Sequence, residues 1–172
     1  AGVGTMLRYA VEKEGFKKEN CYGIDINEDN VKICKKLGFV NIIQGDAKDP
    51  ETWEKWNMKF DKIIMNPPYD KNLHLKILRE VMKHSDDVVN LSPIRWLQDP
   101  LAEYKKNTGG GDKEIDKDLI KRHIESIDII DSVTASNFFG SLQAADLGIY
   151  HLTKNGGFDF SVFENPLVKK IM

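Results

Sequence analysis

Asn66, Pro67, Pro68 and Tyr69 form the stretch of this chain whose residue types could most readily do chemistry. The stretch offers an amide side chain, backbone carbonyls and an aromatic ring. Neither proline can donate to a β-ladder or continue a helix, so the four residues predict a rigid loop with outward-facing polar groups. The apolar run from Phe60 to Met65 precedes it and has the length and β-branched content of a buried strand. The loop is therefore expected at the carboxyl end of a strand, where open α/β sheets bind ligands.

Three earlier segments also predict polar groups at the amino end of a helix or the carboxyl end of a strand. The turn from Ala1 to Thr5 contains Gly2 and Gly4 and leads into a helix expected to run to about Glu14. Glycines at that place let the backbone approach a ligand closely. The alternative is that both belong to an irregular chain end.

Asp25 closes the strand predicted over residues 20–27 and lies about twenty positions after the glycines, a spacing that suits a carboxylate on a ribose. Gly45, Asp46 and Ala47 follow a third strand, predicted over residues 40–44. They suit an adenine ring, with Asp46 accepting from its amino group and the Ala47 amide reaching a ring nitrogen. The alternatives are ordinary: Asp25 or Asn27 caps a helix over residues 30–37, and Gly-Asp is a common turn.

The rest of the chain continues as alternating helices and strands. We expect a helix over residues 73–84, strands over 86–92, within 124–133 and over 145–153, and a turn over 137–140. Asn155, Gly156 and Gly157 predict a hairpin whose returning strand is residues 158–163. Residues 99–122 mix both charge signs around three glycines and indicate a flexible insertion, either a solvated excursion or a phosphate-binding arm.

These elements predict an α/β fold, a doubly wound and mostly parallel sheet with a terminal antiparallel hairpin. The strand that should precede Gly2 is apparently missing, so we expect residues 1–172 to be a single domain from a longer protein.

Composition narrows the functional classes further. Of the 172 residues, 41% are hydrophobic and 30% charged, and no apolar run is long enough to span a membrane. The net charge of −2 argues against a strongly basic nucleic-acid-binding protein. Cys21 and Cys34 have no metal or redox spacing and are expected to be free thiols in a reducing compartment, which favours a cytoplasmic protein. The histidines are scattered, so we expect no metal site.

Taken in order, the glycine turn, Asp25, the Gly45 to Ala47 segment and the Asn66 to Tyr69 loop resemble S-adenosylmethionine-dependent methyltransferases that act on amino nitrogens. The likeness is greatest to adenine-specific DNA methyltransferases of restriction-modification systems. The resemblance implies a Rossmann-like methyltransferase fold and S-adenosylmethionine as cofactor. It also implies DNA as partner, bound through a recognition region that this chain does not contain.

The resemblance also implies a role for each of these residues. Gly2 and Gly4 would approach the cofactor, Asp25 would take the ribose hydroxyls, Ile26 would pack on the cofactor's adenine, and Asp46 and Ala47 would bind its ring edge. Asn66, Pro67 and Tyr69 would be catalytic, and Pro68 and Tyr69 would contact the target base. The Asn66 side-chain oxygen and the Pro67 carbonyl would accept the two hydrogens of the target amine and aim its lone pair at the methyl group.

Three alternatives stay open at this stage. The same tetrapeptide is found in relatives that methylate RNA bases and in relatives that methylate protein glutamine side chains. The chain could also be a catalytically inert structural module.

Overall fold

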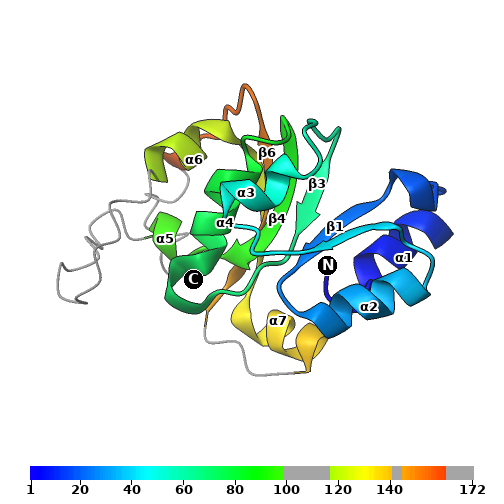
Figure 1. Ribbon diagram of the computed structural model, residues 1–172. Coiled ribbons are helices and arrows are strands. Elements are labelled where there is room, and N and C mark those ends of the chain that lie inside the picture. The colour runs from blue at the N-terminus through cyan, green and yellow to red at the C-terminus, as the bar shows by residue number, and fades with distance from the viewer. Residues whose placement is uncertain (99–116, 141–144, 162–172) are drawn as a thin grey trace. The chain divides into compact units, whose positions relative to one another are not determined.

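The computed structural model describes residues 1–98, 117–140 and 145–161 (Figure 1). The chain divides into two compact units, unit 1 from Ala1 to Asn57 and unit 2 from Met58 to Met172, and each is described by itself. The single domain expected over residues 1–172 stays a prediction. Most of the expected insertion, residues 99–116, lies outside the described residues.

Unit 1 is built on two parallel strands, β1 (Tyr22–Asp25) and β2 (Asn41–Gln44), with Tyr22 opposite Asn41 and Asp25 opposite Gln44. Parallel neighbours need a crossover connection, and α2 (Glu28–Lys36) supplies it. The other elements of unit 1 are α1 (Thr5–Glu12), the 3₁₀ turn η1 (Lys18–Asn20) and α3 (Pro50–Glu54).

The core of unit 1 lies between α2 and the two strands and contains Cys21, Val31, Cys34, Phe39 and Ile42. Both cysteines are buried and carry free thiols, as the sequence predicts.

The ends of α2 follow local sequence signals. The Asn27 side chain accepts a hydrogen bond from the Asp29 amide at 2.8 Å, which caps the helix as expected. Gly38, just beyond the helix, has a φ of +88° and ends it. Asn27 capping is therefore confirmed, and it leaves the carboxylate of Asp25 available for other contacts.

Gly45→Ala is expected to destabilise the protein by about 1–3 kcal/mol through overpacking. An added Cβ would lie 2.5 Å from Cγ2 and 2.8 Å from Oγ1 of Thr52, which is buried in α3. Urea unfolding should show a lower midpoint at an unchanged slope. Thr52→Ala removes both crowded atoms, so Gly45→Ala should cost less in that background. Equal costs in the two backgrounds would show that Thr52 is not the cause.

Unit 2 is built on a mixed sheet in the order β3-β4-β6-β5. Its strands are β3 (Ile63–Met65), β4 (Asp87–Pro93), β5 (Ile124–Ile130) and β6 (Leu147–Thr153). β3 runs parallel to β4, whereas β6 runs antiparallel to both β4 and β5, and Figure 1 shows β3, β4 and β6 side by side. Within unit 2 only β6 runs opposite to the other described strands, and within unit 1 β1 and β2 are parallel, so the expected α/β class is confirmed.

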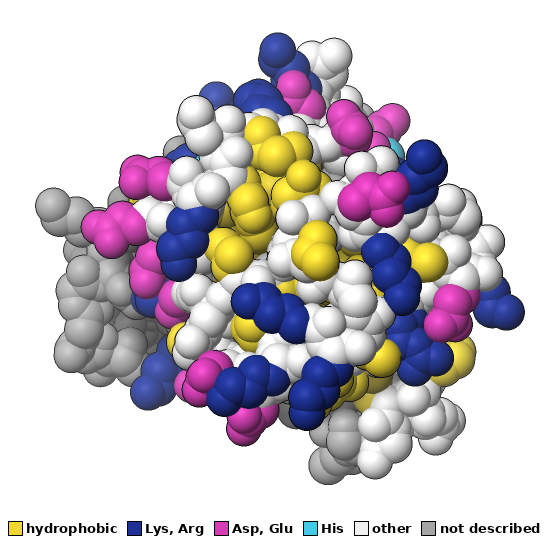
Figure 2. Space-filling model, turned by 45° about the vertical axis from the view of Figure 1, so that its right-hand side comes forward, with side chains coloured by type: hydrophobic (Ala, Val, Ile, Leu, Met, Phe, Trp, Pro, Cys, Tyr) yellow, Lys and Arg dark blue, Asp and Glu magenta, His cyan; other side chains and the backbone are white. Residues whose placement is uncertain are grey.

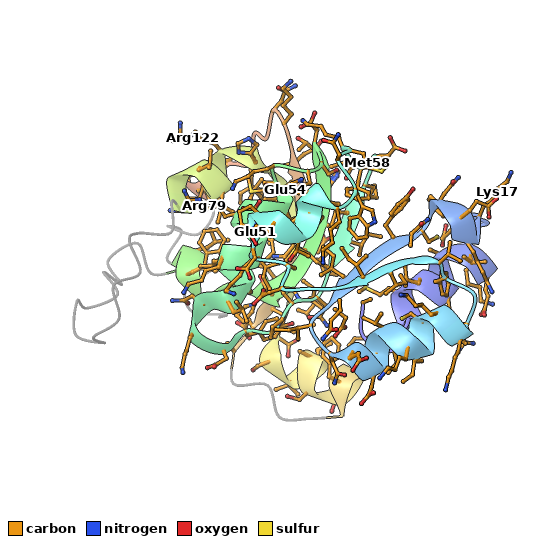
Figure 3. The ribbon with its side chains drawn as sticks, viewed as in Figure 1. Lys17, Glu51, Glu54, Met58, Arg79 and Arg122 are labelled. Carbon is orange, nitrogen blue, oxygen red and sulfur yellow. The ribbon has the colours of Figure 1, made fainter. Side chains whose placement is uncertain are left out.

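Helix α4 (Leu73–Val81) packs against β4 and contributes most of its side chains to the core of unit 2. The other helices that the structure describes in this unit are α5 (Arg95–Gln98), α6 (Lys117–His123) and α7 (Ser132–Phe139), with a 3₁₀ turn η2 (Asp70–Asn72) before α4. The side chains of Arg79 on α4 and Arg122 on α6 are exposed (Figure 3). No helix in residues 1–98, 117–140 or 145–161 is long and apolar enough to cross a membrane.

The prediction of a hairpin after Asn155 is wrong, as far as the structure describes its returning strand. β6 is already hydrogen-bonded to β4 on one side and to β5 on the other, so no edge of β6 is left for another strand. The amides of Gly157 and Phe158 instead donate to the Ile124 carbonyl at 3.0 Å each. Residues 158–161 form no strand, and 162 and 163 lie outside the described residues. The antiparallel pair at the end of the fold is made by β5 and β6.

The turn expected over residues 137–140 is wrong too, because this stretch ends a helix. Asp131 caps α7 by accepting from the amides of Val133 at 3.0 Å and Thr134 at 2.9 Å. Gly140, with a φ of +62°, stands just after the last helical residue. An acidic cap and a glycine at that spacing were the local signals for this helix.

Candidate active site

The first group of candidate residues lies at the carboxyl edge of the unit 1 sheet. β1 ends at Asp25 and β2 ends at Gln44, and the Gly45 amide donates to the Asp25 carbonyl at 3.1 Å. The two polar strand ends that the sequence predicts as cofactor contacts are therefore neighbours. Ile26, next to Asp25, exposes 69% of its surface and offers an apolar face at this edge.

The Asp25 carboxylate is held by several donors. Oδ2 accepts from the Gly2 amide at 2.6 Å and lies 3.2 Å from the Ala1 nitrogen, and Oδ1 accepts from the Asn27 amide at 2.9 Å and from Nδ2 of Asn30 at 3.2 Å. Burial works to raise the pKa of Asp25, but these hydrogen bonds outweigh it and lower the pKa. Gly2, Asn27 and Asn30 already donate to three of the about four lone-pair sites of this carboxylate, so a ribose that offers two hydroxyls would have to displace one of these donors.

The glycines of the first turn are required by its backbone. Gly2 and Gly4 have φ angles of +54° and +83°, in the left-handed region that favours glycine. The turn is closed by a hydrogen bond from the Gly4 amide to the Ala1 carbonyl at 3.2 Å. A Cβ on Gly4 would also lie 3.2 Å from Sγ of Cys34. The turn is therefore a defined structure next to Asp25 rather than an irregular end.

Asp46 does not present a free carboxylate. Its oxygens take the Lys48 amide at 3.1 Å and the Lys48 ammonium at 2.5 Å. Burial works to raise the pKa of Asp46, and the contacts with Lys48 outweigh it and lower the pKa. The Ala47 carbonyl accepts from Nε1 of Trp53 at 2.9 Å, which fixes the segment against α3. A ring amino group at Asp46 would therefore compete with Lys48.

The second group of candidate residues lies in unit 2, at the carboxyl end of β3. β3 ends at Met65, so Asn66 begins the loop as the sequence predicts. Asn66 and Pro68 are exposed, Pro67 is buried and Tyr69 is half-buried. The Tyr69 hydroxyl donates a hydrogen bond to Oδ1 of Asn66 at 2.7 Å. One of the two lone pairs of the oxygen expected to bind the target amine is thus occupied by the loop itself.

The position of Tyr69 depends on residues that the sequence did not single out. Its ring meets the His74 ring edge to face, at 5.9 Å between centroids. Between them, Lys71 and Asn72 adopt left-handed backbone conformations with φ angles of +46° and +60°. Such conformations cluster at functional sites, where the surrounding structure enforces them. Asparagine adopts the left-handed conformation more readily than most residues, so Asn72 is an ordinary place for it. Lysine does not, so the residue type of Lys71 did not predict this conformation.

A buried polar cluster lies on β4 and β6 of the same sheet. Nδ2 of Asn90 donates to Oγ of Ser92 at 2.9 Å, and the Tyr150 hydroxyl donates to the Pro93 carbonyl at 2.9 Å. Burial raises the pKa of Tyr150. The polar residues that alternate with apolar ones along β4 were the available signal for this cluster.

The predicted site residues thus form two groups, each of which the structure brings together. Gly2, Asp25 and the Gly45 to Ala47 segment share one edge of unit 1, and Asn66 and Tyr69 are hydrogen-bonded in unit 2. The roles of all these residues stay predictions.

Comparison with known proteins supports a methyltransferase relationship. No protein-family model matches the chain. Over 69 residues the chain is 38% identical to a protein of Methanocaldococcus jannaschii described as "Putative protein N5-glutamine methyltransferase". That match covers 40% of this chain and 34% of the relative, so the chain spans about a third of the relative's length.

Among solved structures, an rRNA methylase from Streptococcus thermophilus superposes with a TM-score of 0.50 at 10% identity, covering 88% of this chain and 81% of that one. The chain has the fold of a methyltransferase. A Thermoplasma acidophilum protein gives a TM-score of 0.43 at 16% identity over 78% of this chain and 66% of its own. The expected Rossmann-like methyltransferase fold is confirmed, whereas none of these three proteins is described as a DNA adenine methyltransferase or as part of a restriction-modification system.

Proposed function

We propose that this chain belongs to an S-adenosylmethionine-dependent methyltransferase that methylates the side-chain amide of a protein glutamine. The observation that carries the proposal is the 38% identity over 69 residues to the protein described as an N5-glutamine methyltransferase. The exposed Asn66, at the carboxyl end of β3 and hydrogen-bonded to Tyr69, supports it from the geometry of unit 2.

The hydrogen-bond acceptors of the Asn66 to Tyr69 loop suit a substrate whose reacting atom is an amide nitrogen. The lone pair of an amide NH₂ is delocalised into the carbonyl, so the nitrogen is a weak nucleophile. Oδ1 of Asn66 keeps one lone pair free of Tyr69, and the carbonyl of the neighbouring Pro67 would be the second acceptor. Two fixed acceptors for the two N–H groups would orient the nitrogen and favour a pyramidal geometry. S-adenosylmethionine supplies an electrophilic methyl group, so no general base is needed before transfer.

The cofactor would be held by residues of unit 1. The Asp25 carboxylate has the acceptor oxygens that ribose hydroxyls need, and the exposed Ile26 side chain can cover an adenine face. The turn containing Gly2 and Gly4 presents backbone close to Asp25. Asp46 and Ala47 would bind the edge of the cofactor's adenine ring once the Lys48 ammonium is displaced from Asp46. These donors and acceptors fit a nucleoside cofactor.

The charge distribution does not favour nucleic acid as the substrate. The net charge is −2, and Figure 2 shows Lys and Arg side chains next to Asp and Glu side chains on the face in view. Phosphate backbones attract surfaces with an excess of positive charge. DNA or RNA binding would require a further region of the protein, and we treat both as outcomes of the experiment below.

The test is transfer of a tritiated methyl group from S-adenosylmethionine to three acceptors offered in parallel: a glutamine-containing peptide, a structured RNA and adenine-containing duplex DNA. Label is expected in the peptide and should be lost when its glutamine is replaced by glutamate. Label in either nucleic acid alone would overturn the proposed substrate. Cofactor binding without transfer to any acceptor would favour the inert module.

A further inference from the structure

The chain turns sharply between the Asn66 loop and the first residue of α4. Lys71 and Asn72 are consecutive non-glycine residues with positive φ angles, +46° and +60°. They place His74, in the first turn of α4, against the ring of Tyr69. Backbone conformations of this kind persist only where the surrounding contacts enforce them, and the contact between His74 and Tyr69 is one of these.

His74 is a poor residue for simple core packing. Its side chain is 5% exposed, and its Nδ1 atom is buried without a hydrogen-bond partner. Four of the other buried residues of α4 are aliphatic, and the fifth, Glu80, is paired with Lys83 and His84: the aliphatic ones are Leu75, Ile77, Leu78 and Val81. A leucine would fill the same volume without leaving a polar atom unsatisfied. The histidine must therefore be explained by what its ring touches.

The ring of His74 contacts Tyr69 in two ways. The two rings meet edge to face, at 5.9 Å between centroids and 82° between planes. Burial lowers the pKa of the His74 imidazole, whereas an interaction with the Tyr69 backbone works to raise it. Ring and backbone of Tyr69 are thus both fixed by one side chain that is itself locked in the core.

Tyr69 in turn controls the orientation of Asn66. Its hydroxyl donates to Oδ1 of Asn66 at 2.7 Å, which distinguishes the oxygen of the carboxamide from its NH₂ group. An exposed asparagine could otherwise turn its amide over and present donors where an acceptor is needed. The contacts form a continuous series from the core of unit 2, through His74 and Tyr69, to the predicted acceptor oxygen.

We propose that His74 is a positioning residue, which holds Tyr69 so that the tyrosine hydroxyl keeps the Asn66 oxygen turned toward the substrate nitrogen. This inference rests on the proposed function, because the substrate nitrogen is the group that the oxygen serves. It assigns His74 no contact with substrate or cofactor.

His74→Leu separates positioning from packing, because leucine fills the core and removes both contacts with Tyr69. We expect kcat for methyl transfer to fall about tenfold, as misoriented groups cost this much or more. The Kd for S-adenosylmethionine should stay within twofold. His74→Phe restores a ring against Tyr69 and should recover most of kcat. The matched control is His84→Leu, whose ring contacts Glu80, and kcat should not change.

A double-mutant cycle with Tyr69→Phe tests the route through the hydroxyl. Without the hydroxyl, His74 has nothing to position, so His74→Leu should add less than about threefold to the loss in Tyr69→Phe. Fully multiplicative losses, or an unchanged kcat in His74→Leu, would overturn the proposal.

A readout without activity keeps the test independent of the proposed function. Burial raises the pKa of Tyr69, and its phenol can be titrated by NMR after ¹³C-tyrosine labelling. Without His74 to hold it, Tyr69 should become more exposed in His74→Leu, so that its pKa falls toward the ordinary value, whereas His84→Leu should leave it unchanged. If the parent transfers no methyl group but the Tyr69 pKa still shifts in His74→Leu, only the proposed function is wrong. If the Tyr69 pKa does not shift, the role given to His74 is wrong.

Discussion

Asn66→Ala is expected to reduce methyl transfer by about 10²–10³-fold, the usual loss when one fixed hydrogen-bonding group is removed from a reacting centre. The substitution deletes the side-chain oxygen that Tyr69 orients at 2.7 Å and leaves the Pro67 carbonyl as the remaining acceptor. Because Asn66 is exposed, its loss should leave the midpoint of unfolding nearly unchanged. Single-turnover transfer at saturating cofactor measures the effect without a contribution from product release.

Asn155→Ala is the matched control, since Asn155 is also exposed and follows a strand of the same unit. Its rate should equal that of the parent, and both variants should bind S-adenosylmethionine with the parent's Kd. An Asn66→Ala protein that keeps its rate within tenfold of the parent would show that Asn66 is not the acceptor proposed here.

Asp25→Ala is expected to weaken cofactor binding by about 10²-fold or more, as hydrogen bonds to a charged group are worth about 1.5–3 kcal/mol each and a ribose offers two hydroxyls. The change should appear in Kd by titration calorimetry. Asp29→Ala, in the first turn of α2 and highly exposed, is the control and should bind normally. A Kd for Asp25→Ala within threefold of the parent would remove Asp25 from the cofactor site.

The same substitution should have a pH signature in the free protein. The pKa of Asp25 is lowered on folding, so its carboxylate adds stability at neutral pH. That stability is lost as the pH falls below the ordinary aspartate value of about 3.9 and through the lowered folded value. The free energy of unfolding of Asp25→Ala should therefore lie below that of the parent at pH 7 and converge with it in acid. A difference that stays constant with pH would contradict these contacts.

Local rules predicted the parts of the fold that depend on neighbouring residues. The prolines after Met65 place the loop at the strand end, and Asn27 and Gly38 mark the ends of α2. Partner choice in a sheet depends on residues far apart in sequence. The antiparallel pair was predicted between β6 and residues 158–163, but β4 and β5 occupy both edges of β6.

The candidate site divides in the same way. The residue types of Asn66, Tyr69 and Asp25 indicated their chemistry, because each carries a polar group at or just beyond the end of a predicted strand. Their contacts were not visible: the Asp25 bonds to the Gly2 turn and the packing of His74 under Tyr69 arise only after folding. The pairing of Asp46 with Lys48 is local, two residues apart, and the sequence could have indicated it.

The most direct test of glutamine methylation is mass spectrometry of a glutamine peptide after one turnover with S-adenosylmethionine. We expect a peptide one methyl group heavier, with fragment ions that locate the methyl group on the glutamine side chain, and hardly any product from Asn66→Ala in the same time. A peptide of unchanged mass, while adenine in DNA or a base in RNA gains the methyl group under the same conditions, would show that glutamine is not the substrate.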